Sequence, residues 1–129
     1  MAGIGRFEEI DAWKEARDLA RAVYHVTSLA SFNKDIELRK HMRRASVSVM
    51  ANIAEGFDAA SNREFLKFLG YALRSATEIQ SHLYVALDQG YVDQKMFGSL
   101  QEKTVTVKNL IGGFMRYLRL RTRSHRTTP

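Results

Sequence analysis

The sequence contains no cysteine, has its single proline at the last position and lacks any long uninterrupted apolar run. The absence of cysteine excludes disulfides, thiolate zinc sites and cysteine nucleophiles. The absence of internal proline favours long helices. No segment approaches the roughly 18 apolar residues of a membrane-spanning helix, and the N-terminus lacks a signal-peptide pattern. We therefore expect a cytoplasmic protein that makes no membrane contact.

Acidic residues are missing from one end of the chain, so the net charge of +6 is unevenly distributed. Residues 1–115 carry 15 basic and 14 acidic side chains, whereas residues 116–129 carry five arginines and no acid. These are Arg116, Arg119, Arg121, Arg123 and Arg126. Such an end either binds phosphate or is a solvated tail, and composition leaves both readings open. We expect one domain over residues 1–120 and a disordered basic tail over 121–129.

Apolar residues recur at three- and four-residue steps over four segments, which is typical of amphipathic helices. The pattern predicts helices over about 11–29, from after residue 34 to 56, over about 62–89 and over about 93–120. On the second helix the predicted buried stripe consists of Leu38, Met42, Ala45, Val49 and Ile53. Four long helices with short connections predict an all-α fold, an antiparallel up-and-down four-helix bundle.

Polar residues and glycines mark the predicted helix ends. Asp11 and Asp93 are candidate N-caps, and Ser61 with Glu64 matches a capping box. Gly56 and Gly90 fit the left-handed residue that commonly ends a helix.

The segment EFLKFLGYAL (residues 64–73) is too apolar for one buried stripe. Its apolar residues cover well over half of the helix circumference, whereas a bundle face needs about three positions in seven. We predict that the excess forms a subunit interface made by Leu66, Leu69, Tyr71 and Leu73. The plain alternative is a Tyr or Leu that stays partly exposed in a monomer.

Four segments give the sequence a family resemblance. RRASVSVMANIAEGF (residues 43–57), S-x-x-EF-x-x-FL (61–69) and GYV (90–92), together with the entry segment EIDAWKEA (9–16), resemble the small four-helix proteins encoded in intervening sequences of bacterial 23S rRNA genes. The resemblance covers about residues 7–120. It implies a cyclic homo-oligomer, commonly a pentamer, whose biochemical function is poorly established.

A more distant similarity is to the accessory proteins of diversity-generating retroelements. Those proteins resemble basic pentameric barrels that bind nucleic acid and a reverse transcriptase, so the similarity implies RNA or DNA as a partner. The chain departs from the family pattern where Ala59 and Ala60 replace loop cations and where Arg74 replaces a small residue.

The NIAEG string places Glu55 in the last turn of the predicted second helix, where the partial negative charge of the helix end opposes a carboxylate. If the second and third helices pair around the turn at 57–61, Glu55 lies beside the start of the third helix. We predict that Glu55 accepts hydrogen bonds there, or from an arginine of a neighbouring subunit, and that Glu78 pairs with Arg43 or Arg44. The predicted structural polar latch consists of Asn52, Glu55, Ser61, Glu64 and Glu78. A catalytic carboxylate is the minor alternative.

Motifs for chemistry are absent from the sequence, which has neither a Gly-rich phosphate loop nor a serine elbow. Glu37 and His41, like Glu78 and His82, stand four residues apart, whereas di-iron bundles use Glu-x-x-His. We expect no enzyme activity, no metal and no cofactor.

Cations crowd the second helix as well as the tail. The candidate nucleic-acid-binding set comprises Arg39, Lys40, Arg43, Arg44 and Arg74 together with Arg116, Arg119, Arg121, Arg123 and Arg126. A ring of subunits would repeat this set and bind phosphate cooperatively, with steep salt dependence and little sequence specificity. We predict a non-enzymatic oligomer that binds RNA or DNA. The alternative is a scaffold ring that binds an unknown protein partner and no nucleic acid.

Overall fold

The computed structural model describes residues 4–127, with side chains described up to Arg121. Within this range the chain forms four helices and no strand, which confirms the predicted all-α fold. The helices are α1 (Asp11–Thr27), α2 (Ile36–Phe57), α3 (Asn62–Asp88) and α4 (Gln94–Thr127), with short 3-10 turns at Phe7–Glu9 and Phe32–Lys34. No helix in the described part is both long and apolar enough to span a bilayer.

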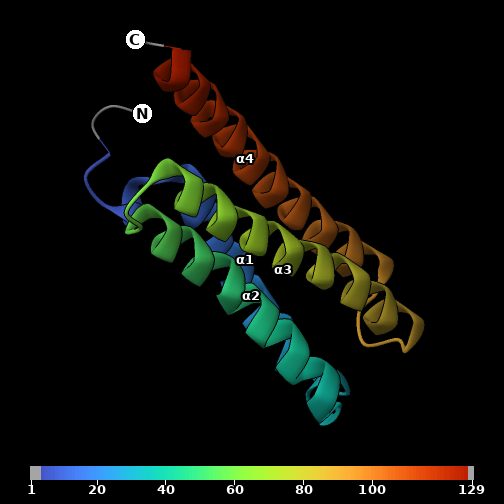
Figure 1. The fold of residues 1–129 in the computed structure, drawn as a ribbon. Coiled ribbons are helices and arrows are strands. Elements are labelled where there is room, and N and C mark those ends of the chain that lie inside the picture. The colour runs from blue at the N-terminus through green and yellow to red at the C-terminus, as the bar shows by residue number, and fades with distance from the viewer. Residues whose placement is uncertain (1–3, 128–129) are drawn as a thin grey trace.

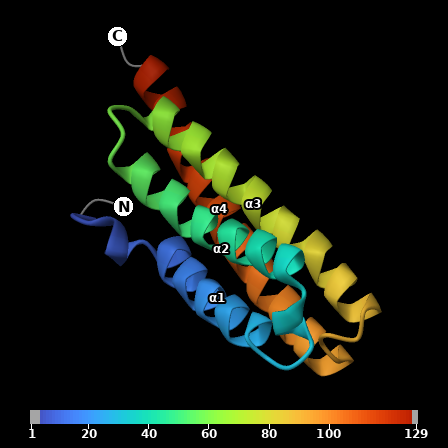
Figure 2. The same ribbon diagram turned by 90° about the horizontal axis from the view of Figure 1, so that it is seen from below.

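Each helix packs beside the next in the chain, and α4 also packs beside α1 (Figures 1 and 2). The rings of His41 and His82 lie 5.8 Å apart, and those of Phe57 and Phe65 lie 6.3 Å apart, so α2 and α3 run past each other in opposite directions. The contact between α2 and α3 is the most extensive of the four, and that between α1 and α4 is the least.

Burial follows the predicted apolar spacing. All five residues predicted for the α2 stripe are buried: Leu38, Met42, Ala45, Val49 and Ile53. The buried hydroxyls are satisfied within their own helices, because Thr27 donates to the Val23 carbonyl at 2.7 Å and Thr104 donates to the Leu100 carbonyl at 2.7 Å. The core is therefore mainly apolar, and these two buried hydroxyls are paired.

Three of the predicted helix ends are confirmed. Ser61 accepts a hydrogen bond from the Glu64 amide at 3.2 Å, and Asp93 accepts one from the Met96 amide at 2.8 Å. Gly90 has a φ of 74°, the left-handed conformation that favours glycine. The prediction for Asp11 is wrong by one residue, because Ile10 occupies the N-cap position and Asp11 begins α1.

Gly56 does not end α2, because the helix continues to Phe57. Gly56 also lacks the left-handed backbone conformation, which among the described glycines belongs to Gly90. The role of Gly56 is steric. A Cβ at this position would lie 2.7 Å from Cδ1 of Phe65 and 3.0 Å from Cβ of Phe68, both on α3. Gly56 therefore lets α2 approach α3 closely at the turn between them.

The GYV string forms the corner between α3 and α4. Tyr91 donates a hydrogen bond to a carboxylate oxygen of Asp35 at 3.0 Å, and its ring stacks on Phe32 at 5.1 Å. The other carboxylate oxygen of Asp35 caps α2 by accepting from the Leu38 amide at 3.1 Å. Asp35 thus ties the start of α2 to the distant α3–α4 corner.

The end of α4 differs from the prediction. The helix was expected to stop near Leu120, but it runs to Thr127, so the expected disordered tail is helical over 121–127. No internal glycine or proline follows Gly113, and nothing in residues 114–127 breaks a helix. In Figure 1 this end of α4 projects past the loop that joins α2 and α3.

Candidate functional site

The polar strip between α2 and α3 is built differently from the predicted latch. Asn52 donates through its side-chain amide to the carbonyl of Ser48 at 2.9 Å and to its hydroxyl at 3.0 Å. The Ser48 hydroxyl meets that of Ser75 on α3 at 2.9 Å. Asn52 therefore connects to the middle of α3 and not to its start. The sequence offers one signal for Ser48, its position four residues before Asn52.

The two helices are shifted by about one turn relative to the predicted pairing. The contacts of Ser48 with Ser75 and of His41 with His82 show this, because the residue numbers of both pairs sum to 123. Pairing around the turn at 57–61, which was predicted to within a turn, gives a sum of about 119. The polar groups predicted to meet are therefore displaced along the helix axis.

Both carboxylates that were expected to be paired are exposed. No described residue forms a hydrogen bond or ion pair with Glu55, so its predicted contact with the start of α3 is wrong within one chain. Its contact with a neighbouring subunit stays a prediction. The predicted pairing of Glu78 with Arg43 or Arg44 is also wrong, because Arg43 turns towards α1 and no described group pairs with Glu78. Glu64 pairs with Lys67 at 3.3 Å and makes no return bond to Ser61 within the described part.

Two of the α2 cations make contacts with other residues of the same chain. Arg43 donates to the Thr27 hydroxyl at 2.9 Å, and its guanidinium lies 4.6 Å from the centre of the Tyr24 ring. Arg39 donates to the backbone carbonyl of Asn33 at 2.6 Å and to its side-chain oxygen at 2.7 Å. Arg43 therefore holds α2 against α1, and Arg39 holds it against the preceding loop. Both guanidinium groups are less available to phosphate than the sequence suggested.

The remaining cations of the α2–α3 side lie on the surface. Lys40 and Arg44 are exposed on α2, and Arg74 on α3 lies 5.5 Å from the centre of the Tyr71 ring. The same two helices also carry the exposed carboxylates Glu55 and Glu78. The mixture of signs makes this side a weak phosphate-binding surface.

The end of α4 is different because it carries cations only. Arg116 and Arg119 are exposed, and Arg121 donates to the Tyr117 hydroxyl at 2.7 Å. Residues 103–129 contain no Asp or Glu. The side chains of Arg123 and Arg126 lie outside the described part of the chain.

The predicted subunit interface does not form one surface. Leu69 is 1% exposed and belongs to the core of its own chain, so its assignment to an interface is wrong. Leu66 and Leu73 are half-buried and lie on one side of α3, seven residues apart. Tyr71, exposed at 38%, is two residues from Leu73 and so points to a different side of the helix, where it packs against Phe68.

Histidines meet between α2 and α3 without forming a metal centre. The His41 ring is close to that of His82 and lies 3.6 Å from a carboxylate oxygen of Glu37. Among the described residues, no group of three or more His, Cys, Asp or Glu side chains is placed to hold a metal ion. The Nε2 atom of His82 is buried and has no hydrogen-bond partner in the described part.

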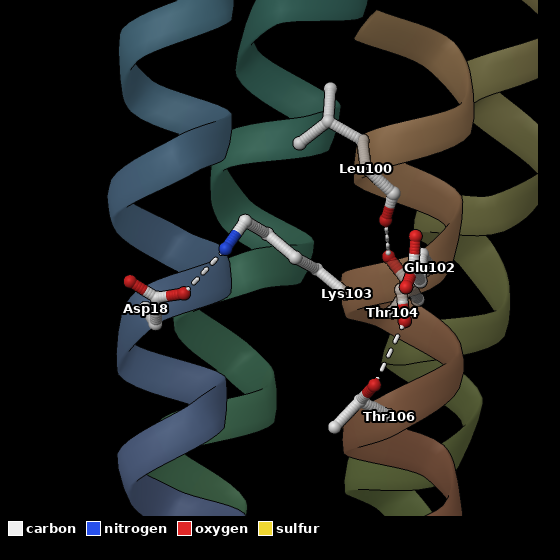
Figure 3. Close-up of polar contacts among 6 residues, drawn as sticks. All are labelled: Asp18, Leu100, Glu102, Lys103, Thr104 and Thr106. Atoms are coloured by element: carbon white, nitrogen blue, oxygen red, sulfur yellow. Dashed lines mark hydrogen bonds and ion pairs between the residues drawn. The ribbon is translucent and has the colours of Figure 1, made fainter. Parts of the chain in front are cut away.

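An ion pair across the line of contact between α1 and α4, here called the α1–α4 seam, was not predicted from the sequence. Lys103 crosses from α4 to Asp18 on α1 with an N–O distance of 2.7 Å (Figure 3). Both side chains are about half exposed. The two residues are 85 positions apart, so no local pattern could have paired them.

Open grooves lie on either side of this ion pair. One, of about 430 Å³, is lined by Val26 and Leu100 among others. The other, of about 520 Å³, is lined by Asp11, Leu110 and Phe114 among others. The Lys103–Asp18 ion pair thus bridges α1 and α4, and an open groove lies on each side of it along the two helices.

The fold and the charge distribution define a small four-helix protein whose last helix ends in a basic, acid-free segment. The chain belongs to the 23S rRNA-intervening sequence protein family, which it matches over residues 8–113. No curated protein matches the chain.

A solved structure supports the fold assignment. The chain is similar to a protein of unknown function from the S23 ribosomal protein family of Bacteroides thetaiotaomicron, with a TM-score of 0.75 and 23% sequence identity. The match covers 81% of this chain and 95% of the other. At this level of identity the likeness establishes the fold alone.

Proposed function

We propose that this chain is a non-enzymatic subunit of a cytoplasmic cyclic homo-oligomer that binds RNA or DNA through phosphate contacts, with little sequence specificity. The observation that carries the proposal is the acid-free end of α4, where Arg116 and Arg119 are exposed. Arginines in such a position neutralise phosphates and release counterions, so affinity falls steeply with salt. Phosphate contacts position a protein on nucleic acid but read no base sequence.

The subunits are antiparallel up-and-down bundles, and we favour a pentamer. The half-buried Leu66 and Leu73, and the exposed carboxylate of Glu55, which pairs with no group in the described part of the chain, support contact of one chain with another. A ring would repeat the α4 ends and raise their combined affinity for one nucleic acid. Multi-angle light scattering tests the assembly, and a mass near the 14.7 kDa of one chain would contradict it.

Nucleic-acid binding is tested with a labelled structured RNA over a salt series. Replacing Arg116 and Arg119 by glutamine removes two cations from each subunit, so the slope of log affinity against log salt should become shallower by about two for every subunit that contacts the RNA. The matched control replaces Arg39 and Arg43 by glutamine. These arginines already hold internal partners, so the control should change the slope less. An unchanged slope in the α4 variant would contradict the proposal.

The alternative function is a scaffold ring that binds a protein partner and no nucleic acid. It is favoured by the contacts of Arg39 and Arg43 within the chain, which engage two of the predicted phosphate ligands. In that case the α4 arginines complement the negative end of the helix dipole and keep the surface solvated. RNA binding that is absent at low salt would support this alternative.

A further inference from the structure

The groove at the α1–α4 seam has an apolar floor supplied by both helices. Ala22 and Val26 of α1 face it, four residues apart, and Met96 and Leu100 of α4 face it with the same spacing. Val26 and Leu100 are buried, whereas Ala22 and Met96 are half-buried. The floor therefore presents two short parallel rows of apolar side chains at helical spacing.

The ionisable side chains at the rim of the groove are His25, Lys95 and Lys103, of which Lys103 is neutralised by Asp18. His25 on α1 and Lys95 on α4 are exposed beside the floor, and Lys103 closes one end through its ion pair with Asp18 (Figure 3). No lining residue is acidic. An occupant of this groove gains from apolar contact at its centre and from negative charge at its edges.

We propose that this groove binds an acidic amphipathic helix of a protein partner. Its open side and its volume of about 430 Å³ suit apolar anchors of a helix that lies along the seam. The flexible side chain of Met96 can adapt to such anchors. This inference goes beyond nucleic-acid binding and uses none of the α4 arginines.

The test measures binding of one defined peptide to the full-length protein. The probe is a fluorescein-labelled 14-residue peptide of two heptads, with Leu at the apolar positions and Glu at the flanking ones. Its binding is measured by fluorescence anisotropy. Ala22→Glu places a carboxylate on the groove floor and should weaken binding at least ~10-fold. Lys95→Glu reverses an exposed rim charge without touching the core and should weaken it about three- to tenfold.

The matched control is Lys40→Glu, the same charge reversal at an exposed position of α2. It should leave the affinity for the peptide unchanged within about twofold, because Lys40 does not line the groove. Circular dichroism of each variant checks that the helices are retained.

Three outcomes would overturn the proposal. The first is no binding of the peptide up to millimolar concentration. The second is equal weakening by Lys40→Glu and Lys95→Glu, which would indicate general attraction to a basic protein. The third is dissociation of an oligomer by Ala22→Glu, which would make a second copy of this chain the occupant. RNA binding by the α4 arginines is measured separately, so either proposal can fail without the other.

Discussion

The two seams on either side of the bundle are closed in different ways. Between α2 and α3, Gly56 removes a side chain where Phe65 approaches, and the hydroxyls of Ser48 and Ser75 meet directly. Between α1 and α4, one half-exposed ion pair crosses the seam, and grooves remain on both sides of it. A glycine and small polar residues thus line the α2–α3 seam, whereas two long charged side chains bridge the α1–α4 seam.

The largest difference between the seams should appear on truncation of a buried leucine. Leu69→Ala on α3 should lower the free energy of unfolding by about 3–5 kcal/mol, because Leu69 is 1% exposed and lies in the closed part of the core. Leu100→Ala, which removes the same atoms beside the open groove, should cost about 2–3 kcal/mol. Urea denaturation at one fixed protein concentration measures both.

Equal losses in the two variants would show that the α1–α4 seam is packed as tightly as the core. A Leu69→Ala protein of unchanged stability that dissociates into single chains would restore Leu69 to a subunit interface.

The next effect concerns Gly56. Gly56→Ala should destabilise the protein by about 1–3 kcal/mol, because the added Cβ would overlap with the Phe65 ring and force α2 away from α3. Gly70→Ala is the matched control on α3, where a Cβ meets nothing within 4 Å. It should stabilise the protein by up to about 1 kcal/mol through helix propensity. Thermal unfolding of both variants should give shifts of opposite sign, and two stabilised proteins would rule out a tight α2–α3 turn.

A smaller effect is expected at high pH. The hydrogen bond to the Asp35 carboxylate, with some burial, raises the pKa of Tyr91 above its ordinary value of 10.0. A raised pKa contributes stability that is fully present below pH 10 and is lost as the pH rises through the folded-state value. The stability of the natural protein should therefore fall more steeply above pH 10 than that of Tyr91→Phe. Parallel pH profiles would show that this corner does not depend on the hydrogen bond.

The smallest effect should come from the ion pair of the open seam. Lys103→Met should cost less than about 1 kcal/mol, because Lys103 and Asp18 are both about half exposed and screened by water. The difference from the natural protein should shrink further at 1 M salt, since the Debye length falls to about 3 Å. Denaturation at low and high salt measures it, and a loss above 2 kcal/mol would mean that this contact closes the seam.

The sequence was sufficient for the helices and most of their ends but not for the contacts between them. The α2 stripe and the caps at Ser61 and Asp93 were predictable because helical periodicity and capping are local. The pairing of α2 with α3 could be predicted only to within about a turn, and the observed shift is of that size, because no local pattern sets how two helices are shifted along each other.

The candidate site was less predictable than the fold. Spacing alone placed four cations on α2, but it could not tell that Arg43 reaches Thr27 on another helix while Arg44 stays exposed. The Asp18–Lys103 pair joins positions far apart in the sequence and so left no local signal. Charge composition did identify the end of α4, because an acid-free segment is a property of the sequence itself.

Native-state hydrogen exchange tests most directly whether the α1–α4 seam is the open side of the bundle. Amides in the middle of α3 should exchange only with the free energy of global unfolding, whereas amides of α1 should exchange through a smaller opening of lower free energy. Equal exchange free energies for α1 and α3 would contradict the account, because they would show that both seams open only when the whole bundle unfolds.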